Sequence, residues 1–227
     1  MFKKWSLFRK QVPYPNNFES AYSDVLTPKD LEKFNEWIPQ SLQFTIDILP
    51  YVRRLIKNWS NDKILNVLDV GAGHASGTHL LSVLFRSNFF GVKMKVDALE
   101  IVDTYKKFSE QCYPEINYIV KDIFDMKSTN KWNLIICSHT IEHLEDPIPF
   151  IKKLCDLSTD WVLLYAPFNE TGVRPENHIS TITQEMVDLL NPVFSEIFVS
   201  PGWDRREGDR QCILFVLKGR NNSTKFS

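Results

Sequence analysis

The chain has 227 residues, of which 43% are hydrophobic and 24% are charged, a composition typical of a globular protein that buries a core. Its 27 basic and 28 acidic side chains leave a formal net charge of -1, whereas proteins that bind nucleic acid over a broad surface are usually basic. No apolar run approaches the ~20 residues that span a bilayer, and residues 1–10 lack the continuous apolar stretch of a secretory signal. The composition therefore argues against nucleic-acid partners and against stable membrane insertion.

The first regular element that the pattern predicts is helical and covers residues 27–59. Thr27 is placed to cap it and Pro28 suits the first helical position. Because proline interrupts the hydrogen bonds of a helix, we expect Pro39 and Pro50 to break this segment into separate pieces.

Short apolar runs then alternate with amphipathic segments. Predicted strands cover residues 64–70, 92–102, 116–120, 132–138, 161–168, 193–200 and 212–219. Predicted helices cover residues 74–85, about 103–112, 147–157 and 183–190, the last of these capped by Thr183. Nearly continuous apolar strands separated by helices indicate a mostly parallel sheet covered on both faces. The last two strands have no helix between them, so they should form a hairpin that makes the last strand antiparallel. The expected fold is α/β and Rossmann-like, with seven strands.

The four cysteines do not form a C-x-x-C pair; they are Cys112, Cys137, Cys155 and Cys212. Cys137 and Cys212 lie inside apolar runs. This placement favours buried, reduced thiols in a cytoplasmic protein over disulfides or zinc ligands.

A glycine-containing turn follows the first predicted strand, in the stretch NVLDVGAGHASG. Gly71 and Gly73 lie where ligands bind in sheets of this kind, at the carboxyl end of the strand. A dinucleotide fingerprint needs a third glycine three residues after Gly73, but Gly77 comes one position late. Asp69, just before the turn, would repel a pyrophosphate and attract an ammonium group. The turn is therefore predicted to receive a ligand with a positively charged end.

Two further acids follow the next two strands. Glu100 ends the second strand, where it can accept hydrogen bonds from both hydroxyls of a ribose, and Asp122 follows the third within reach of an adenine amino group. An acid for an amine, one for a ribose and one for a base together describe S-adenosylmethionine. Taken singly, Asp69 could instead cap a helix, Glu100 could be a solvated strand end, and Asp122 could be a turn residue.

The motifs VLDVGAG, ALEIVD, VKDIF and IICSHTIEHLEDP resemble, in order and spacing, those of class I S-adenosylmethionine-dependent methyltransferases. The similarity runs from about Ile64 to Gly219 and is greatest to the small-molecule branch that includes the ubiquinone-biosynthesis O-methyltransferases. Ala75 is a departure, because the family usually has the third glycine of its loop there. The resemblance implies S-adenosylmethionine as cofactor and S-adenosylhomocysteine as product. It implies cofactor contacts from Asp69, Gly71, Ala72, Gly73, Glu100, Ile101, Asp122, Ile123 and Ser138.

Three regions are expected on this basis. Residues 1–60 would form an N-terminal helical extension or lid, residues 61–220 the cofactor-binding catalytic domain, and residues 221–227 a flexible tail. Aromatic side chains of the extension could close over the site and exclude water; they include Trp5, Phe8, Tyr14, Phe18 and Tyr22. Simple packing against the sheet is the alternative.

Histidines dominate the predicted acceptor side. His139, Glu142 and His143 follow the fourth strand at positions i, i+3 and i+4, so one helical face could present all three. Histidine is the natural general base for a hydroxyl acceptor, and His178, after the fifth strand, is a second candidate. We predict catalytic roles for His143, His178, His139 and Glu142. The alternative is that Glu142 and His143 bond backbone groups and that His178 caps the helix near Thr183.

The cluster after the fourth strand also offers ligands for a divalent metal. Some of the resembling ubiquinone enzymes depend on a metal, with an acidic residue at the position of His139. The change to histidine alters ligand hardness, so the sequence leaves a metal open but does not predict one.

Loop residues near the carboxyl edge are predicted to bind the acceptor; they are Arg174, Trp203, Arg205 and Arg206. Arginine forks match phosphate or carboxylate oxygens, which favours an anionic acceptor. Acidic residues are interleaved with these arginines, so a solvated loop with local ion pairs is the alternative.

The sequence therefore predicts a small-molecule methyltransferase that acts on a hydroxyl of a sugar, a phosphorylated compound or another polar metabolite. N-methylation of a small molecule and an inactive methyltransferase-like binding module remain alternatives. Asp69 argues against a nucleotide-dependent oxidoreductase. Enzymes that methylate the amines of nucleic-acid bases resemble one another in an Asn/Asp-Pro-Pro-aromatic motif after the fourth strand, and SHTI stands there in this chain, which argues against that activity. The acceptor and the oligomeric state are not determined by the sequence.

Overall fold

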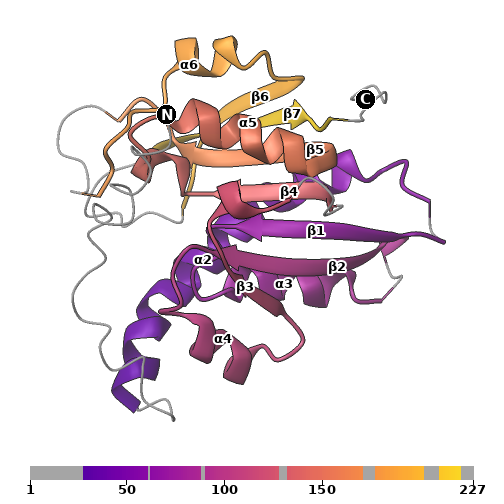
Figure 1. Ribbon diagram of the computed structural model, residues 1–227, viewed down its shortest axis with the longest axis vertical. Coiled ribbons are helices and arrows are strands. Elements are labelled where there is room, and N and C mark those ends of the chain that lie inside the picture. The colour runs from indigo at the N-terminus through magenta and orange to yellow at the C-terminus, as the bar shows by residue number, and fades with distance from the viewer. Residues whose placement is uncertain are drawn as a thin grey trace.

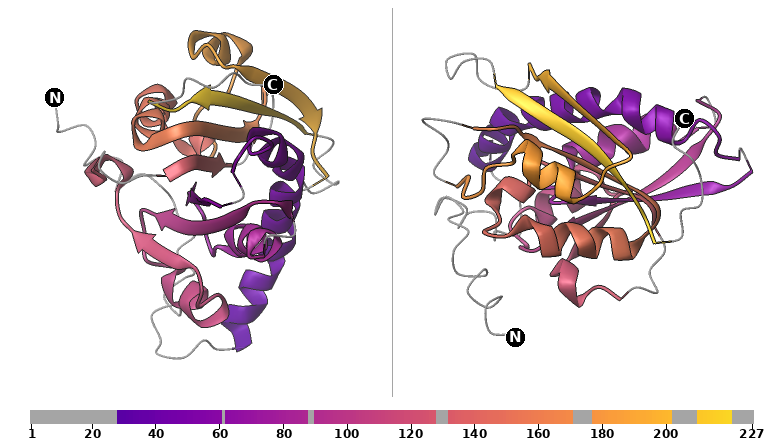
Figure 2. Two further views of the ribbon diagram at one scale, coloured as in Figure 1. Left: turned by 90° about the vertical axis from the view of Figure 1, so that its right-hand side faces the viewer. Right: turned by 90° about the horizontal axis from the view of Figure 1, so that it is seen from above.

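The computed structural model describes residues 28–60, 62–87, 90–127, 132–170, 177–201 and 210–220. They build one seven-stranded sheet with the order β3-β2-β1-β4-β5-β7-β6 (Figures 1 and 2). The strands are β1 (Ile64–Val70), β2 (Lys93–Glu100), β3 (Asn117–Val120), β4 (Trp132–Ser138), β5 (Ser158–Pro167), β6 (Phe194–Val199) and β7 (Gln211–Lys218). The first five pair in parallel, while β7 runs antiparallel to both β5 and β6. The predicted fold class is confirmed, including the antiparallel last strand.

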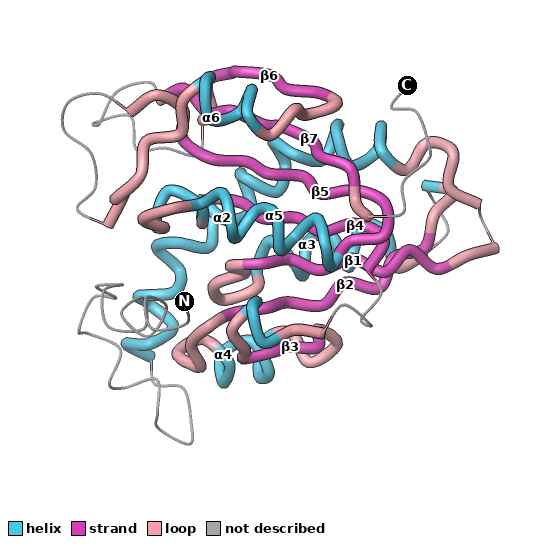
Figure 3. Tube along the Cα trace, turned by 45° about the horizontal axis from the view of Figure 1, so that its top comes forward, coloured by secondary structure: helices cyan, strands magenta, loops and turns pink. Residues whose placement is uncertain are grey.

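Helices cover both faces of the sheet, as expected for strands that are apolar along their whole length. Among the described residues they are α2 (Pro28–Leu55), α3 (Ser76–Phe85), α4 (Lys106–Cys112), α5 (Pro147–Leu157) and α6 (Gln184–Leu189), and the 3-10 turns η3 (Ile123–Asp125) and η4 (Ile141–His143) follow β3 and β4. Side chains of α2 and α3 share one buried cluster with the sheet, and those of α5 and α6 share another on the opposite face. Figures 1 and 3 show α5 on one side of the strands and α2 on the other.

The prediction that prolines divide the first helical segment is wrong. Helix α2 runs without interruption through Pro39 and Pro50. A proline inside a helix costs about 3 kcal/mol because it removes a hydrogen bond and crowds the preceding turn. Phe44, Ile48 and Val52, one turn apart, are buried against the sheet, and this packing offsets the cost.

Smaller differences concern where elements begin. The helix expected from about residue 103 begins at Lys106, and β5 begins at Ser158 rather than at Trp161. Ser158 pairs with Trp132 of β4, because backbone hydrogen bonds extend a strand whatever the polarity of its side chains. The predicted cap of α6 is confirmed, since Thr183 Oγ1 accepts a hydrogen bond from the Met186 N–H at 3.4 Å.

The cysteines are free, and Cys137 and Cys212 are buried as predicted. Within the part of the chain that the structure describes, none of the helices combines the length and apolar character that crossing a membrane requires.

Candidate active site

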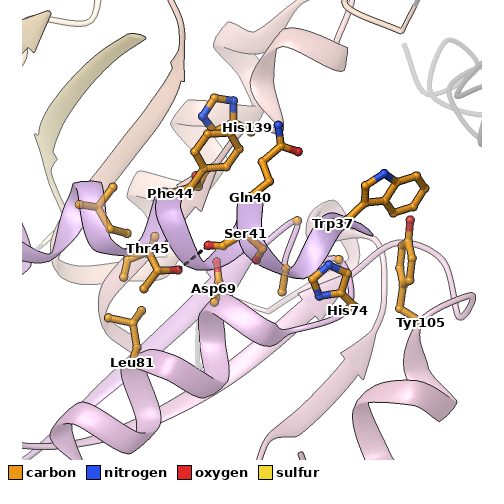
Figure 4. A pocket seen from close by; sticks show the side chains of 17 residues that line it. Trp37, Gln40, Ser41, Phe44, Thr45, Asp69, His74, Leu81, Tyr105 and His139 are labelled. Atoms are coloured by element: carbon orange, nitrogen blue, oxygen red, sulfur yellow. Dashed lines mark hydrogen bonds between the residues drawn. The ribbon is translucent and has the colours of Figure 1, made fainter. Parts of the chain in front are cut away.

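A pocket opens at the carboxyl end of β1, which lies between β2 and β4 at the point where the strand order reverses. Ligands of doubly wound sheets bind at this switch point. The pocket has a volume of about 260 Å³ and is lined by the glycine turn, the end of β4 and the middle of α2. Figure 4 shows Gln40, Ser41 and Phe44 of α2 on the side of the pocket opposite Asp69 and Leu81.

The glycine turn has a left-handed backbone, with φ of 74° at Gly71 and 53° at Gly73. The N–H groups of Gly71 and Ala72 donate to the Leu99 carbonyl at 2.9 and 3.3 Å. Ala75, which departs from the family pattern, is buried and adopts a φ of 62°, so the alanine takes up the left-handed conformation that glycine adopts without strain. This costs about 1–2 kcal/mol, which the packed surroundings of Ala75 offset.

Asp69 lies in the lining of the pocket, as does Ser138 at the end of β4. Oδ2 of Asp69 accepts a hydrogen bond from the Thr78 hydroxyl at 2.5 Å. Burial raises the pKa of Asp69 to about 6, although the bond from Thr78 opposes the rise. The hydroxyl oxygen of Ser138 is buried and has no hydrogen-bond partner among the described residues. A pocket with a carboxylate and an unsatisfied hydroxyl suits a polar ligand that carries positive charge.

Glu100 supports the glycine turn from the end of β2. Its two carboxylate oxygens accept hydrogen bonds from the N–H groups of Gly73, at 3.2 Å, and Ile101, at 3.0 Å. Burial raises its pKa to about 7 against these bonds, and the charge of Asp69 adds to the rise.

Four of the predicted cofactor residues are not in the pocket lining: Glu100, Ile101, Asp122 and Ile123. Asp122 caps η3, because its Oδ1 accepts a hydrogen bond from the Phe124 N–H at 2.9 Å. This contact agrees with the alternative that Asp122 is a turn residue. Contacts of these residues with a ribose and an adenine stay predictions.

His139 lies in the pocket lining directly after β4, in a strained conformation with φ of 50°. Its ring stacks on Phe44 of α2, with centroids 3.7 Å apart, and meets the edge of Tyr165 at 4.8 Å. Left-handed backbone at a residue other than glycine persists only where the surroundings enforce it, and such residues gather at functional sites.

Behind His139, the other three predicted catalytic residues gather. Glu142 is buried, with His139 Nδ1 3.3 Å from its Oε1. Burial alone would raise the pKa of Glu142, but His139, His143 and His178 around it hold that pKa below its usual range. The rings of His143 and His178 lie 5.0 Å apart. The structure therefore brings all four predicted residues together, but only His139 lines the pocket.

The local geometry of this group differs from the expected helical face. His139 precedes η4 and only Glu142 and His143 belong to that single 3-10 turn. His178 does not cap α6; its Nδ1 contacts Glu170 Oε2 at 2.7 Å. His143 does bond backbone, through Nδ1 to the Asn177 carbonyl at 2.8 Å.

The predicted acceptor-binding residues Arg174, Trp203, Arg205 and Arg206 lie outside the described residues. The aromatic side chains expected in a lid, from Trp5 to Tyr22, lie outside them as well.

The sequence predicts that residues 1–60 cover the site, but it did not identify the α2 side chains that line the pocket. Among the described side chains of α2, six line it: Trp37, Gln40, Ser41, Phe44, Thr45 and Ile48. Their spacing of three or four residues places them on one face of a helix, and this spacing is the sequence feature that could have identified them. Helix α2 also approaches α3 closely, because a side chain at Gly77 would collide with Thr45.

The two raised acid pKa values predict how stability depends on pH. A carboxyl whose pKa is higher in the native state binds more protons there than in the unfolded chain. Its contribution to stability is therefore present below pH 4 and is lost as the pH rises through the native pKa. For Glu100, with a native pKa of about 7, this loss is on the order of 3 kcal/mol between pH 4 and pH 8. Denaturant unfolding of the wild type and of Glu100→Gln across this range should show a less negative pH slope in the variant, and equal slopes would contradict the assignment.

Comparisons with known proteins agree with this geometry. A family model described as a methyltransferase domain matches residues 40–175. The ubiquinone biosynthesis O-methyltransferase of Rickettsia canadensis is 30% identical over 138 residues, covering 56% of this chain and 56% of that protein. The chain thus spans about half the length of the curated relatives it matches.

Solved structures show the same fold at low sequence identity. The plantazolicin methyltransferase, in complex with S-adenosylhomocysteine, superimposes with a TM-score of 0.59 at 13% identity, covering 89% of this chain and 94% of the other. The N-methyltransferase NodS of Bradyrhizobium japonicum, also with S-adenosylhomocysteine, gives 0.56 at 13% identity, with 95% and 98% covered. A family model matches more than half of the chain, and the glycine turn with its acids lies at the switch point of the sheet. This protein therefore belongs to the class I S-adenosylmethionine-dependent methyltransferases.

Proposed function

We propose that the chain binds S-adenosylmethionine at the carboxyl end of β1 and transfers its methyl group to a small molecule. The observation that carries this proposal is the Asp69 carboxylate in the lining of a pocket formed by left-handed glycine backbone. A carboxylate there favours the ammonium group of an amino-acid moiety and disfavours a pyrophosphate. Ser138 offers a hydroxyl without a partner among the described residues to the same ligand.

The remainder of the cofactor would extend toward Glu100. Tyr118 donates its hydroxyl hydrogen to the Gly73 carbonyl at 2.6 Å, and the Gly73 N–H donates to Glu100, so the turn is fixed from both sides. A hypothetical side chain at Gly73 would meet no atom within 4 Å, so that backbone faces open space that a ligand can occupy. A rigid turn beside open space is a pre-formed binding surface.

We assign the acceptor an oxygen nucleophile. Methyl transfer is an in-line displacement in which the acceptor oxygen forms a bond to the methyl carbon while the sulfonium sulfur takes the electron pair of the breaking bond. A hydroxyl acceptor must also lose its proton, and a group of three histidines around one carboxylate supplies acceptors for it. His139 lines the pocket, while His143, His178 and Glu142 lie behind it. Which of them takes the proton stays a prediction, as does an anionic acceptor.

Methylation of an amine is the second candidate, because a fold neighbour is an N-methyltransferase. An amine that reacts as the free base needs no strong general base, so this alternative leaves the histidine cluster without a role in proton transfer. Transfer of a labelled methyl group to panels of hydroxyl and amine acceptors would separate the two, and transfer to amines alone would contradict our assignment.

Calorimetry provides the test of the cofactor. We expect the purified protein to release or absorb heat on titration with S-adenosylhomocysteine and to give none with nicotinamide adenine dinucleotide. A dissociation constant in the micromolar range corresponds to about 8 kcal/mol of binding free energy. Absence of binding to S-adenosylhomocysteine would overturn the proposal. Binding without transfer to any acceptor would favour an inactive binding module.

A further inference from the structure

Glu142, His143 and His178 converge from two separate segments of the chain. Glu142 and His143 belong to η4, directly after β4, whereas His178 follows β5. One potential ligand atom from each of the three lies within 4.8 Å of the other two. We propose that these three side chains bind a divalent transition-metal ion of the Zn²⁺ type, in preference to Mg²⁺.

Both imidazoles are held in the orientation that metal ligation needs. His143 Nδ1 lies 2.8 Å from the Asn177 carbonyl, and His178 Nδ1 lies 2.7 Å from the Glu170 carboxylate. A carbonyl or an ionised carboxylate only accepts hydrogen bonds, so each Nδ1 donates, and in the neutral ring that metal ligation requires the lone pair then lies on Nε2. Histidines that ligate metals are nearly always oriented in this way through their other nitrogen.

A third residue, Arg210, stabilises the contact between His178 and Glu170. Arg210 Nη1 donates to the other oxygen of Glu170 at 2.8 Å, which fixes the carboxylate that orients His178. Arg210, Glu170 and His178 thus form a chain of charge-assisted contacts that ends at the cluster. Outer contacts of this kind commonly change metal affinity by 10- to 100-fold.

Glu142 supplies the observation that points to a ligand. Its side chain is 1% exposed, and its Oε1 has only the long contact of 3.3 Å with His139 Nδ1, while Oε2 accepts no hydrogen bond from the described residues. A buried carboxylate with an oxygen that no donor contacts is costly unless a cation compensates it. A metal ion held by Glu142 and the two imidazoles would satisfy it, and it would leave His139, in the pocket lining, as the histidine that accepts the proton of a hydroxyl acceptor.

The backbone holds the cluster together independently of any ion. The N–H groups of Ile179 and Ser180 both donate to the Glu142 carbonyl, at 2.9 and 3.0 Å. These bonds tie the segment that carries His178 to the turn that carries Glu142. The ligands are therefore pre-organised, which favours binding because little conformational entropy is lost.

The ligand set determines the preferred metal. Mg²⁺ takes oxygen ligands, whereas two imidazoles and one carboxylate suit Zn²⁺ and its neighbours. The ligand set implied by the ubiquinone enzymes, with an acid at the position of His139, does not fit this chain. His139 stacks on Phe44 in the pocket wall and is not a member of the converging group, whereas His178 is.

The test uses the full chain after treatment with a chelator. Isothermal titration with ZnCl₂ is expected to show one ion per chain with a micromolar or lower dissociation constant. At 100 times that constant, the unfolding midpoint should rise by about 5–10 °C. CoCl₂ should produce visible absorption bands of a site with nitrogen ligands, and MgCl₂ should leave the midpoint unchanged.

Variants locate the ion and include a matched control. Glu142→Gln and His178→Gln, which keep side-chain size, should each weaken Zn²⁺ binding by 100-fold or more, and Glu170→Gln by about 10-fold. His79→Gln is the control, because His79 also contacts a glutamate, Glu115, at 2.5 Å but is not a member of the converging group. It should leave Zn²⁺ affinity unchanged. Binding that survives both ligand variants, or no Zn²⁺ binding by the folded wild type, would overturn the proposal, and equal affinity for Mg²⁺ would overturn the choice of metal. These outcomes are independent of S-adenosylhomocysteine binding, so failure here leaves the proposed function untouched.

Discussion

Replacing Asp69 with asparagine should weaken the binding of S-adenosylhomocysteine by about 100-fold or more. Asp69 lies in the pocket lining, and its carboxylate is the proposed partner of the ammonium group of the ligand. Removing one partner of a buried, hydrogen-bonded charge pair costs about 2–5 kcal/mol. Each loss of about 1.4 kcal/mol in binding free energy lowers the affinity tenfold. Calorimetry with wild type and variant at the same pH measures the difference directly.

This substitution should not impair folding. An asparagine oxygen can still accept the hydrogen bond that Thr78 donates to Asp69, and the variant removes a carboxylate whose burial already raises its pKa to about 6. Stability at neutral pH should therefore be retained or increased. Asp97→Asn is the matched control, because Asp97 accepts hydrogen bonds from Trp132 and Asn117 on the sheet and does not line the pocket. If Asp69→Asn bound the ligand as tightly as the Asp97 variant, the charge argument for the cofactor would be refuted.

Replacing Gly71 with alanine should lower the unfolding midpoint by about 5–15 °C. Gly71 has a φ of 74°, and a Cβ atom there would overlap with the Thr140 side chain. The left-handed backbone costs an alanine about 1–2 kcal/mol, and overpacking adds about 1–3 kcal/mol. For a chain of this length, each kcal/mol shifts the midpoint by about 2–4 °C. Thermal unfolding followed by circular dichroism measures the shift.

Two further variants separate the causes of this effect. Gly73→Ala has a similar backbone strain, with φ of 53°, but its Cβ would meet no atom within 4 Å, so it should lose only about 1–2 kcal/mol. Combining Gly71→Ala with Thr140→Ala should recover part of the stability, because the colliding hydroxyl and methyl groups are removed. Equal destabilisation by the two glycine variants would show that steric overlap with Thr140 is unimportant.

The two glycine positions also differ in what they do for the ligand. The Gly71 N–H donates to the Leu99 carbonyl, so this residue joins β1 to the end of β2. Gly73 faces the open space of the pocket. Alanine at Gly73 should therefore affect ligand affinity more than stability, and alanine at Gly71 the reverse.

Much of the fold could be predicted from local patterns. All seven strands and the hairpin at the end of the sheet follow from apolar runs and from the segments between them. The inner strands are mostly apolar because they are buried on both faces, whereas the edge strand β6 is largely exposed. The position of Asp69 next to the switch point follows in turn, since the carboxyl ends of parallel strands share one edge of the sheet. The continuity of α2 could not be predicted, because it depends on the burial of Phe44, Ile48 and Val52 against strands far away in the sequence.

The sequence by itself determined the fold class, the acids at the carboxyl ends of the first three strands and the family to which the chain belongs, because each of these depends on spacing along the chain. Only the tertiary structure decided that α2 forms one wall of the pocket, that His139 turns toward that pocket, and that His178 joins Glu142 and His143. His178 is 35 residues from His143 in the chain, and the two meet only because parallel β4 and β5 end at the same edge of the sheet. Contacts of this kind are set by the pairing of strands and the packing of a helix across them, which no local pattern of residues encodes.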